Sequence, residues 1–491
     1  MKSMLKYLIV IFFAICVWVG VDAQQTLTLS QALILAESGS PSMKKAHFSL
    51  EQSQQSLIAQ KAALKARFSL SLNPLSYNNT LNFDDRYSSW YNYEKLSSYG
   101  TLTVSQPVLL TNTTISVINS FGWQQTSSNY SGVASTDKSF VNDFYVALKQ
   151  PLFTYNSQKM SLKELELSVE NAEIEYSLSR LLLEKTVTTL FFDVYIAQLY
   201  LDIANEELKN TQKTRDIIAD KVQNGLAANV ELYQADLNLS TAKSTISYRE
   251  VSLEDAKADF KKYVGIDLSK EISVIATVDA SDSLLIPVNK AIEYGLDLRM
   301  ELRQRKIEIE NEQFTLTKTK DYNDFDGSVT LSMGLTGNDP VMRNVYNMPA
   351  KSPSVEVTFS VPLFDWGERK ARIKAQEAAV KSTVIDLDSE KTGIAVEIGK
   401  ICRSIQNYKI QVDIEKQNQL NAELAYDINL EKYKNGDLTS MELNLYQSQL
   451  SNKKISLAQA RINYKLEILN LKIATLYDFE KNQSVTVLHK K

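Results

Sequence analysis

Apolar side chains recur at alternating steps of four and three residues through a long segment of the chain. They stand at Leu183, Val187, Leu190, Val194, Ala197, Leu201, Ala204 and Leu208. This spacing is typical of a helix packed in a coiled coil. The predicted helix runs from about 156 to 222 without proline or glycine, stops at Asn224-Gly225, and resumes from about 230 to 264.

A pattern with a period of two marks four short segments. In one of them Val355, Val357 and Phe359 are separated by Glu356 and Thr358, which predicts a strand with one apolar and one polar face. The other segments carry Phe68, Leu70 and Leu72; Phe144, Val146 and Leu148; and Val329, Leu331 and Met333. The apolar face would be the core of a soluble sandwich, or it would face lipid in a membrane barrel whose polar side lines water.

The chain consists of two copies of one unit. The matching segments are Pro151-Leu152-Phe153 with Pro362-Leu363-Phe364, and Asn224-Gly225 with Asn435-Gly436. Each pair is 211 residues apart, whereas the upstream pair Ser71-Leu72 and Thr330-Leu331 is 259 residues apart, so the first copy carries 48 extra residues. The second copy predicts a long helix over about 370–433 and a last helix that ends near 477.

The duplication gives the domain organisation. We expect a first repeat over 24–265, a linker or equatorial segment over 266–287, a second repeat over 288–477 and a C-terminal tail over 478–491. Each repeat should contain a helix, a strand pair, a long helix, a tip turn and a return helix. The first strand pair carries the long insertion, over 74–142.

Element lengths favour a barrel shared between chains. A helix of about 68 residues is roughly 100 Å long, and the opening helix of each repeat, about 29–66 and 288–320, reaches a similar length when stacked on its return helix. Four strands cannot close a barrel and leave two open edges, which lipid does not tolerate. Several chains must share one barrel, and three would give twelve strands and twelve helical rods.

The first residues are typical of an export signal. Lys2 and Lys6 precede an apolar run, and small residues at Val21-Asp22-Ala23 suit cleavage, so we expect a signal peptide over 1–23. Beyond it no uninterrupted apolar run reaches about 18 residues, so the sequence predicts no membrane-spanning helix. Entry into a membrane would then require a barrel.

Composition offers little for chemistry. After the signal peptide one cysteine remains, Cys402, and the two histidines are His47 and His489, too few for a disulfide or a histidine-based metal site. Lys+Arg 54 against Asp+Glu 58 leaves a net charge of -4, which does not suggest a nucleic-acid partner. No phosphate loop, zinc spacing or nucleophile constellation is present, so we expect no enzyme, no catalytic residue, no metal and no cofactor.

The duplicated strand-Pro-Leu-Phe-helix joint and the duplicated Asn-Gly turns, in this order, resemble the TolC-like family of outer-membrane efflux channels over essentially the whole mature chain. The resemblance implies an α+β membrane protein in the cell outer membrane, with long antiparallel coiled-coil helices in a periplasmic α-barrel and a trimeric, twelve-stranded β-barrel. It implies a homotrimer that conducts cargo passively for an inner-membrane efflux or secretion pump and a periplasmic adaptor. Amphipathic strands in both repeats argue against the alternative, a periplasmic coiled-coil scaffold without a pore.

The Asn-Gly turns are the candidate adaptor-docking site. A glycine at a helix end supplies the left-handed backbone that a sharp reversal needs, and the resemblance adds that such turns form the periplasmic tip. The first tip is Asn224, Gly225, Leu226 and Ala227, and the second tip is Asn435, Gly436, Asp437 and Leu438.

A periplasmic gate is expected close to the tips. Glu231 and Glu442 each follow a tip glycine by six residues, and the resemblance suggests a ring of acids at the entrance, together with Tyr433. The alternative is an ordinary acid in the first turn of a helix. Leu438 and Leu445 stand where the family would have an arginine and a second acid, so packing and hydrogen bonds would hold the gate.

The insertion is crowded with aromatic residues, at Tyr77, Tyr87, Trp90, Tyr91, Tyr93 and Tyr99. Such rings suit a barrel rim or an external loop. Because the second repeat has no counterpart, we expect an extracellular hairpin in preference to added barrel strands.

Overall fold

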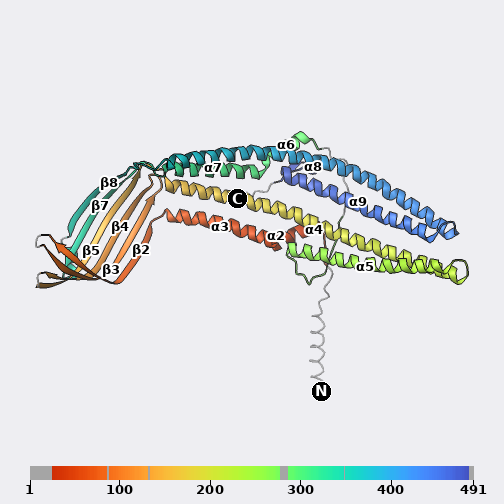
Figure 1. The fold of residues 1–491 in the computed structure, drawn as a ribbon, viewed down its shortest axis with the longest axis horizontal. Helices are drawn as coiled ribbons and strands as arrows, with labels where there is room; N and C mark the ends of the chain where they lie inside the picture. Colours follow the sequence, from red (N-terminus) through yellow and green to blue (C-terminus); the bar gives the residue numbers. More distant parts are fainter. Residues whose placement is uncertain (1–24, 86–87, 131–132, 277–285, 348, 486–491) are drawn as a thin grey trace, which may run out of the picture. The chain divides into compact units, whose positions relative to one another are not determined.

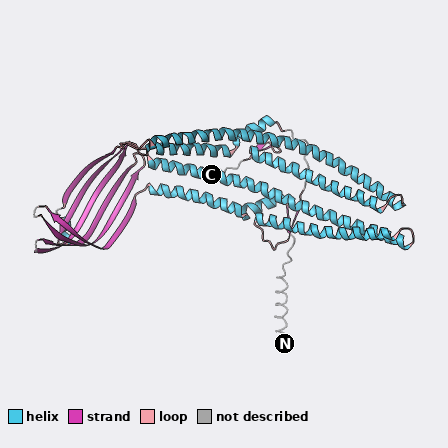
Figure 2. Cartoon of the chain, in the orientation of Figure 1, coloured by secondary structure: helices cyan, strands magenta, loops and turns pink. Residues whose placement is uncertain are grey.

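The computed structural model of the chain describes residues 25–85, 88–130, 133–276, 286–347 and 349–485. Figure 2 distinguishes its helices and strands by colour. The described residues form two compact units: the first comprises those within 1–49, 173–303 and 388–491, and the second comprises those within 50–172 and 304–387. The signal peptide predicted over 1–23 lies outside the described residues.

The long helices expected from the heptad spacing are present. They are α4 (Ser157–Gln223), α5 (Asn229–Val264), α8 (Glu368–Asn435) and α9 (Ser440–Thr475). None of the eight heptad positions of α4 is exposed. Among the described helices, α4 alone is long and apolar enough to cross a membrane by length and composition, and 44% of its most apolar window is buried within the chain. Coiled-coil packing therefore accounts for its apolar character.

The opening helix of each repeat is broken, so the prediction of one continuous helix is wrong in both. The structure has α2 (Leu29–Gly39) and α3 (Pro41–Ala63), then α6 (Val288–Leu298) and α7 (Met300–Asp321). Ser40 is extended because the proline after it disfavours helical backbone. Arg299, 259 residues later, is extended as well. Its guanidinium binds Glu301 at 3.1 Å and Glu397 at 2.6 Å.

The core of the first unit lies where α2, α4 and α5 meet a short parallel strand pair, β1 (Gln25–Leu27) and β6 (Ile272–Val274). Phe191 of α4 and Phe260 of α5 are fully buried, with ring centroids 6.3 Å apart. The Gln198 side chain accepts from the Val274 N–H at 3.0 Å and donates to the Val274 carbonyl at 3.3 Å. Part of the expected linker over 266–287 is thus a strand held on the core.

The second unit contains an antiparallel sheet with the strand order β2-β3-β4-β5-β7-β8 among the described residues (Figure 1). Its strands are β2 (Arg67–Asp84), β3 (Ser89–Val108), β4 (Thr113–Tyr130), β5 (Val133–Leu152), β7 (Asp326–Asp339) and β8 (Ala350–Ser360). The insertion supplies β3 and β4, which lie between β2 and β5, so the prediction of an extracellular hairpin is wrong. β3 pairs with β2 on one side and β4 on the other, which satisfies its backbone hydrogen bonds within the sheet.

Cross-strand pairing gathers the apolar side chains of the sheet on one face, because directly paired residues point to the same side. One row of partners across β2 to β8 is Phe68, Val104, Val117, Val146, Met333 and Pro353. The adjacent row, on the opposite face, is Arg67, Ser105, Ser116, Ala147, Ser332 and Ser354. Phe68, Leu72 and Val355 are exposed. The described residues cover the apolar face only in part, where the short helix η1 (Met342–Tyr346) packs beside Gly337 and the Tyr346 ring stacks on Phe121. Most of the face is open, so the chain does not form the two-layered core of a soluble sandwich.

Two neighbouring leucines of α4 test the packing of the first unit. Leu183 is 3% exposed and Leu182 is 59% exposed. We expect Leu183→Ala to lower the free energy of unfolding by about 2–5 kcal/mol, because it leaves a cavity in the core, whereas Leu182→Ala should cost less than about 1 kcal/mol. Denaturant unfolding followed by circular dichroism of the detergent-purified protein measures both. Equal losses in the two variants would contradict the helix orientation.

Candidate functional site: the helical tips and the amphipathic sheet

The two tip turns have the same backbone geometry. Gly225 has a φ of 71° and Gly436 a φ of 86°. In the first tip the Leu226 N–H donates to the Lys221 carbonyl at 2.7 Å, and in the second the Asp437 N–H donates to the Lys432 carbonyl at 2.9 Å. Each helix thus ends with a glycine in the left-handed conformation and a hydrogen bond from residue i to residue i−5. Corresponding residues of the two turns are 211 positions apart. The duplication therefore extends to the hydrogen bonds of the tips.

Apolar side chains surround both turns. Leu226 is 77% exposed and Met441 is 72% exposed, and Val230, Tyr233 and Leu445 are exposed as well. Asn224, Asn435 and Asp437 are exposed, whereas Ala227 and Leu438 are half-buried. The Asn224 amide donates to the Asp220 carbonyl at 2.8 Å. The tips thus offer small apolar patches on rigid turns.

The two candidate gate acids have different surroundings. Glu442 belongs to a capping box at the start of α9: its carboxylate accepts from the Thr439 N–H at 3.0 Å, and the Thr439 hydroxyl accepts from the Glu442 N–H at 3.3 Å. The backbone and hydroxyl hydrogen bonds from Thr439 lower the pKa of Glu442. At the start of α5 the cap position is Ala228, which has no side-chain acceptor, so Glu231 stands in the first turn without a capping partner.

Tyr433 lies where the two helical hairpins of the first unit meet. It is buried, and the Lys221 ammonium of α4 is 5.2 Å from the centre of its ring. Burial, followed by the nearby charge of Glu231, raises the pKa of the Tyr433 hydroxyl. That hydroxyl has no hydrogen-bond partner within the described residues. The charge of Glu231 thus acts on the buried Tyr433, whereas Glu442 is engaged in its own helix cap.

Ion pairs that the sequence reasoning missed connect the helices near the tips. Arg215 of α4 binds Asp236 of α5 at 2.8 Å, and Asp236 raises the pKa of the guanidinium. Arg215 lies ten positions before Gly225 and Asp236 eleven positions after it. Residues at equal distances from the turn face each other in an antiparallel hairpin, so this pair could have been predicted from the sequence. Lys454 of α9 binds Glu206 of α4 at 3.2 Å, which connects the two hairpins. Sequence spacing could not reveal that contact, because 248 residues separate its partners.

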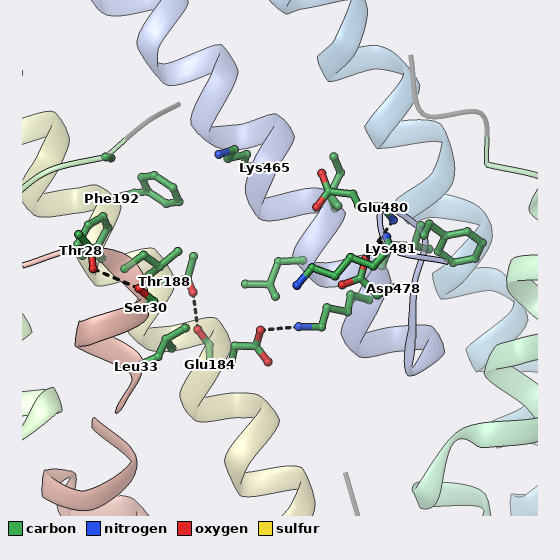
Figure 3. A pocket seen from close by; sticks show the side chains of 18 of the residues that line it. Thr28, Ser30, Leu33, Glu184, Thr188, Phe192, Lys465, Asp478, Glu480 and Lys481 are labelled. Carbon is green, nitrogen blue, oxygen red and sulfur yellow. Dashed lines mark hydrogen bonds and ion pairs between the residues drawn. The ribbon is translucent and has the colours of Figure 1, made fainter. Parts of the chain in front are cut away.

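A cavity of about 540 Å³ lies in the first unit, between the start of α2, α4 and the end of α9 (Figure 3). On its wall Lys472 binds Glu184 at 2.7 Å, and the Thr188 hydroxyl donates to the Glu184 carbonyl at 2.7 Å. These charged groups already serve the packing of α4 against α9. Within the described residues there is no group of three His, Cys, Asp or Glu side chains that could hold a metal ion.

A sheet with one continuous apolar face, followed along the chain by antiparallel helical hairpins with apolar tips, defines an outer-membrane channel protein with a helical periplasmic part. The outer membrane efflux protein family model matches residues 114–265 and 304–475. The chain belongs to this family, which consists of transport channels and not of enzymes. It is an outer-membrane efflux channel subunit that extends into the periplasm.

Solved structures with the same fold include three bacterial outer-membrane channels. The CmeC channel of Campylobacter jejuni is 15% identical, with a TM-score of 0.70 over 93% of this chain and 86% of that one. VceC of Vibrio cholerae is 14% identical, with a TM-score of 0.65 over 92% and 95%. The open-state MtrE channel of Neisseria gonorrhoeae is 13% identical, with a TM-score of 0.63 over 92% and 89%. A sequence search of curated proteins finds no match.

The unequal helix caps of the two tips give a reciprocal test. Thr439→Ala removes the cap of α9 and should cost about 1 kcal/mol locally, which is about a fivefold faster exchange of the first-turn amide hydrogens. Ala228→Thr creates the same Thr-x-x-Glu sequence with Glu231 and should slow exchange in α5. Hydrogen exchange with mass spectrometry reports both, and unchanged exchange in Thr439→Ala would contradict the cap.

The same cap should depend on pH. Because the folded pKa of Glu442 lies below its unfolded value, its stabilisation is complete above the unfolded pKa and is lost as the pH falls through the folded pKa. The exchange difference between Thr439→Ala and the unmodified protein should therefore shrink in acid.

Proposed function

We propose that three copies of this chain form one channel that conducts cargo passively from an inner-membrane efflux or secretion pump, through a periplasmic adaptor, to the cell exterior. The observation that carries this proposal is the open sheet. In the described residues β2 and β8 each pair on one side only, and unpaired backbone groups cannot face hydrocarbon. Closure between copies satisfies both edges, since β2 of one copy can pair with β8 of the next.

Apolar stripes on the helices support the same assembly. On α5 the exposed residues Val230, Tyr233 and Leu237 follow steps of three and four, and on α8 Ile410 and Ile414 are exposed in the same way. Among the described helices of the first unit, α5 and α8 lie at the two edges and have a neighbouring helix on one side (Figure 1). Exposed coiled-coil stripes of this kind are suited to a second copy of the chain.

The two tips are the proposed docking site for the adaptor. They combine rigid turns, fixed by Gly225 and Gly436, with exposed apolar side chains such as Leu226 and Met441. An apolar patch on a preformed turn suits a helical hairpin of a partner, because little conformational entropy is lost on binding. The full proposed set is Asn224, Gly225, Leu226, Ala227, Asn435, Gly436, Asp437 and Leu438.

Glycine substitution at the tips tests docking. Gly225→Val and Gly436→Val should abolish most export while trimers remain in the outer membrane, because a β-branched residue resists a positive φ and the turn must rearrange. Gly393→Val is the matched control, since Gly393 lies in α8 and a side chain there meets open space. Cargo export and heat-modified trimer migration are measured together. Full export by both tip variants would remove the docking role.

Glu231, Glu442 and Tyr433 are the proposed gate. Tyr433 connects the two hairpins, so its packing couples any outward movement of one tip to the other. In a trimer the acids of three copies would surround the entrance, where carboxylates attract cations. Leu438 is half-buried and contributes packing where the family has a charged lock. We propose no catalytic residue and no cofactor for this passive conduit.

Ion selectivity tests the gate. Glu231→Gln and Glu442→Gln should each lower the preference for cations over anions in planar-bilayer recordings, with the larger effect at Glu231, because Glu442 is held by Thr439. Glu250→Gln, on α5 but several turns away from the tip, should leave selectivity unchanged. If both gate variants keep the preference of the unmodified channel, the carboxylates are merely solvated first-turn acids.

A further inference from the structure

We propose that the membrane barrel of this channel has eighteen strands, six from each chain, and is as wide as the ring of twelve helical rods, so that cargo meets no narrowing at the membrane. The inference rests on the proposed trimer and goes beyond it. It concerns the hairpin β3–β4, which the second repeat lacks. This hairpin is part of the sheet, it is anchored at the helical end of the sheet, and it gives the barrel a perimeter that matches the helical ring.

The hairpin carries the same two faces as the strands around it. On the apolar face β4 presents Ile115, Val117, Phe121 and Trp123, and the paired residues of β3 include Val104 and Gly100. The span from Thr113 to Trp123 matches the about 9–11 residues that a tilted strand needs to cross a membrane. Beyond Trp123 the same face becomes polar, with Gln125, Ser127 and Asn129. A loop outside the membrane has no need of such a band.

Polar side chains within the band are satisfied by each other. Asn119 of β4 donates to Asn142 of β5 at 2.9 Å, and Asn142 is buried. On the opposite face Thr101 of β3 donates to Ser120 of β4 at 3.0 Å. A buried amide needs a partner, and the inserted strand β4 provides it to Asn142 of β5. The inserted strands are thus part of the sheet itself and do not form a layer on top of it.

The end of β3 and the turn that follows it are hydrogen-bonded to the ends of the neighbouring helices. The Gln106 amide donates to the Leu64 carbonyl, just beyond α3, at 2.9 Å. The Asn156 amide donates to the Leu109 carbonyl of the turn at 2.7 Å, while its oxygen accepts from the Lys159 N–H at 2.9 Å and so caps α4. The hairpin therefore lies in the sheet between β2, which follows α3, and β5, which precedes α4.

At an ordinary strand tilt, the perimeters of the two parts agree when the added strands are included. Strands 4.8 Å apart and tilted by about 45° each occupy about 7 Å of circumference, so eighteen strands span about 120 Å and twelve about 80 Å. Twelve helices at about 9–10 Å spacing form a ring of about 110–120 Å. Three inserted hairpins thus give the membrane part the circumference of the helical ring, without a stronger tilt or a taper.

Cysteine labelling of the two faces tests the wall. Single cysteines replace Val104, Ser105, Val117 and Ser116 of the inserted strands, and Val146 and Ala147 of β5 serve as controls. A charged, water-soluble maleimide added to whole cells should react on the order of tenfold faster at the Ser105, Ser116 and Ala147 positions, because the reactive thiolate does not form in hydrocarbon. The native Cys402 is buried and sets the baseline in the unmodified protein.

The outcomes separate this inference from the proposed function. Alternation in β5 with uniform labelling of β3 and β4 would overturn the eighteen-strand barrel and leave the channel intact. Uniform labelling of β5 as well, or a monomeric mass in detergent, would overturn the proposed trimeric channel itself. Alternation in all three strands, together with a trimeric mass, supports the inference.

Removal of the hairpin tests the width. In a variant that lacks residues 89–130, β2 is followed directly by β5 and can pair with it, as β7 pairs with β8. Three copies of this variant would close a twelve-stranded barrel. The backbone cross-section should then fall roughly twofold, so neutral polymers added from the extracellular side should be excluded at a smaller size. An unchanged exclusion size in trimers of this variant would overturn the inference, and the labelling experiment decides it if the variant does not assemble.

Discussion

The structure depends on one constraint, that backbone N–H and C=O groups in hydrocarbon must be hydrogen-bonded within the protein. In the six-stranded sheet the four internal strands have hydrogen-bonded neighbours on both sides. The edge strands β2 and β8 each have one neighbour among the described strands, so their outer backbone groups remain unpaired in the single chain. The side chains of the sheet follow the same rule. Apolar residues occupy the face that is largely open, and the two amides on it, Asn119 and Asn142, are hydrogen-bonded to each other. An incomplete barrel of this kind is a strong physical reason for assembly, because each open edge matches the other.

The helical part follows a different rule, since water surrounds it and apolar packing must hold it. Heptad residues of α4 form the buried side, and ion pairs such as Glu206–Lys454 and Glu184–Lys472 connect α4 to α9 across the two repeats. Ion pairs that stay partly open to water, as these two do, contribute little stability each. They therefore specify which helices are neighbours more than they stabilise the packing. The tips end these hairpins with identical backbone turns, yet only the second has a side-chain cap. The first turns of α5 and α9 therefore differ in stability, at the tips where the adaptor is proposed to bind.

The insertion shows how such a channel can change its membrane part without changing its helices. Adding a hairpin preserves the antiparallel order, because two strands restore the direction of the chain. The sheet grows by two strands while the same strands, β2 and β5, still lead from α3 and into α4. Asn156 links the two parts, since it caps α4 and binds the inserted turn with the same side chain. The number of strands can therefore change while the number of helices in each repeat stays the same.

The long helices, the tip turns and the amphipathic strands could be predicted from the sequence, because periodicity and glycine positions act over a few residues. The repeat could be predicted because its two copies keep matching motifs at a constant offset. The sequence did not reveal the breaks at Ser40 and Arg299 as helix ends, and it favoured an external hairpin where the structure has β3 and β4. These points depend on the folded chain, because strand neighbours are set by backbone pairing between distant segments, such as Phe68 of β2 with Val104 of β3 and Val117 of β4 with Val146 of β5. The same holds for the candidate site. Gly225 and Gly436 could be found from their spacing, whereas the contact of Tyr433 with Lys221 and the pairing of Arg215 with Asp236 exist because folded helices bring distant side chains together.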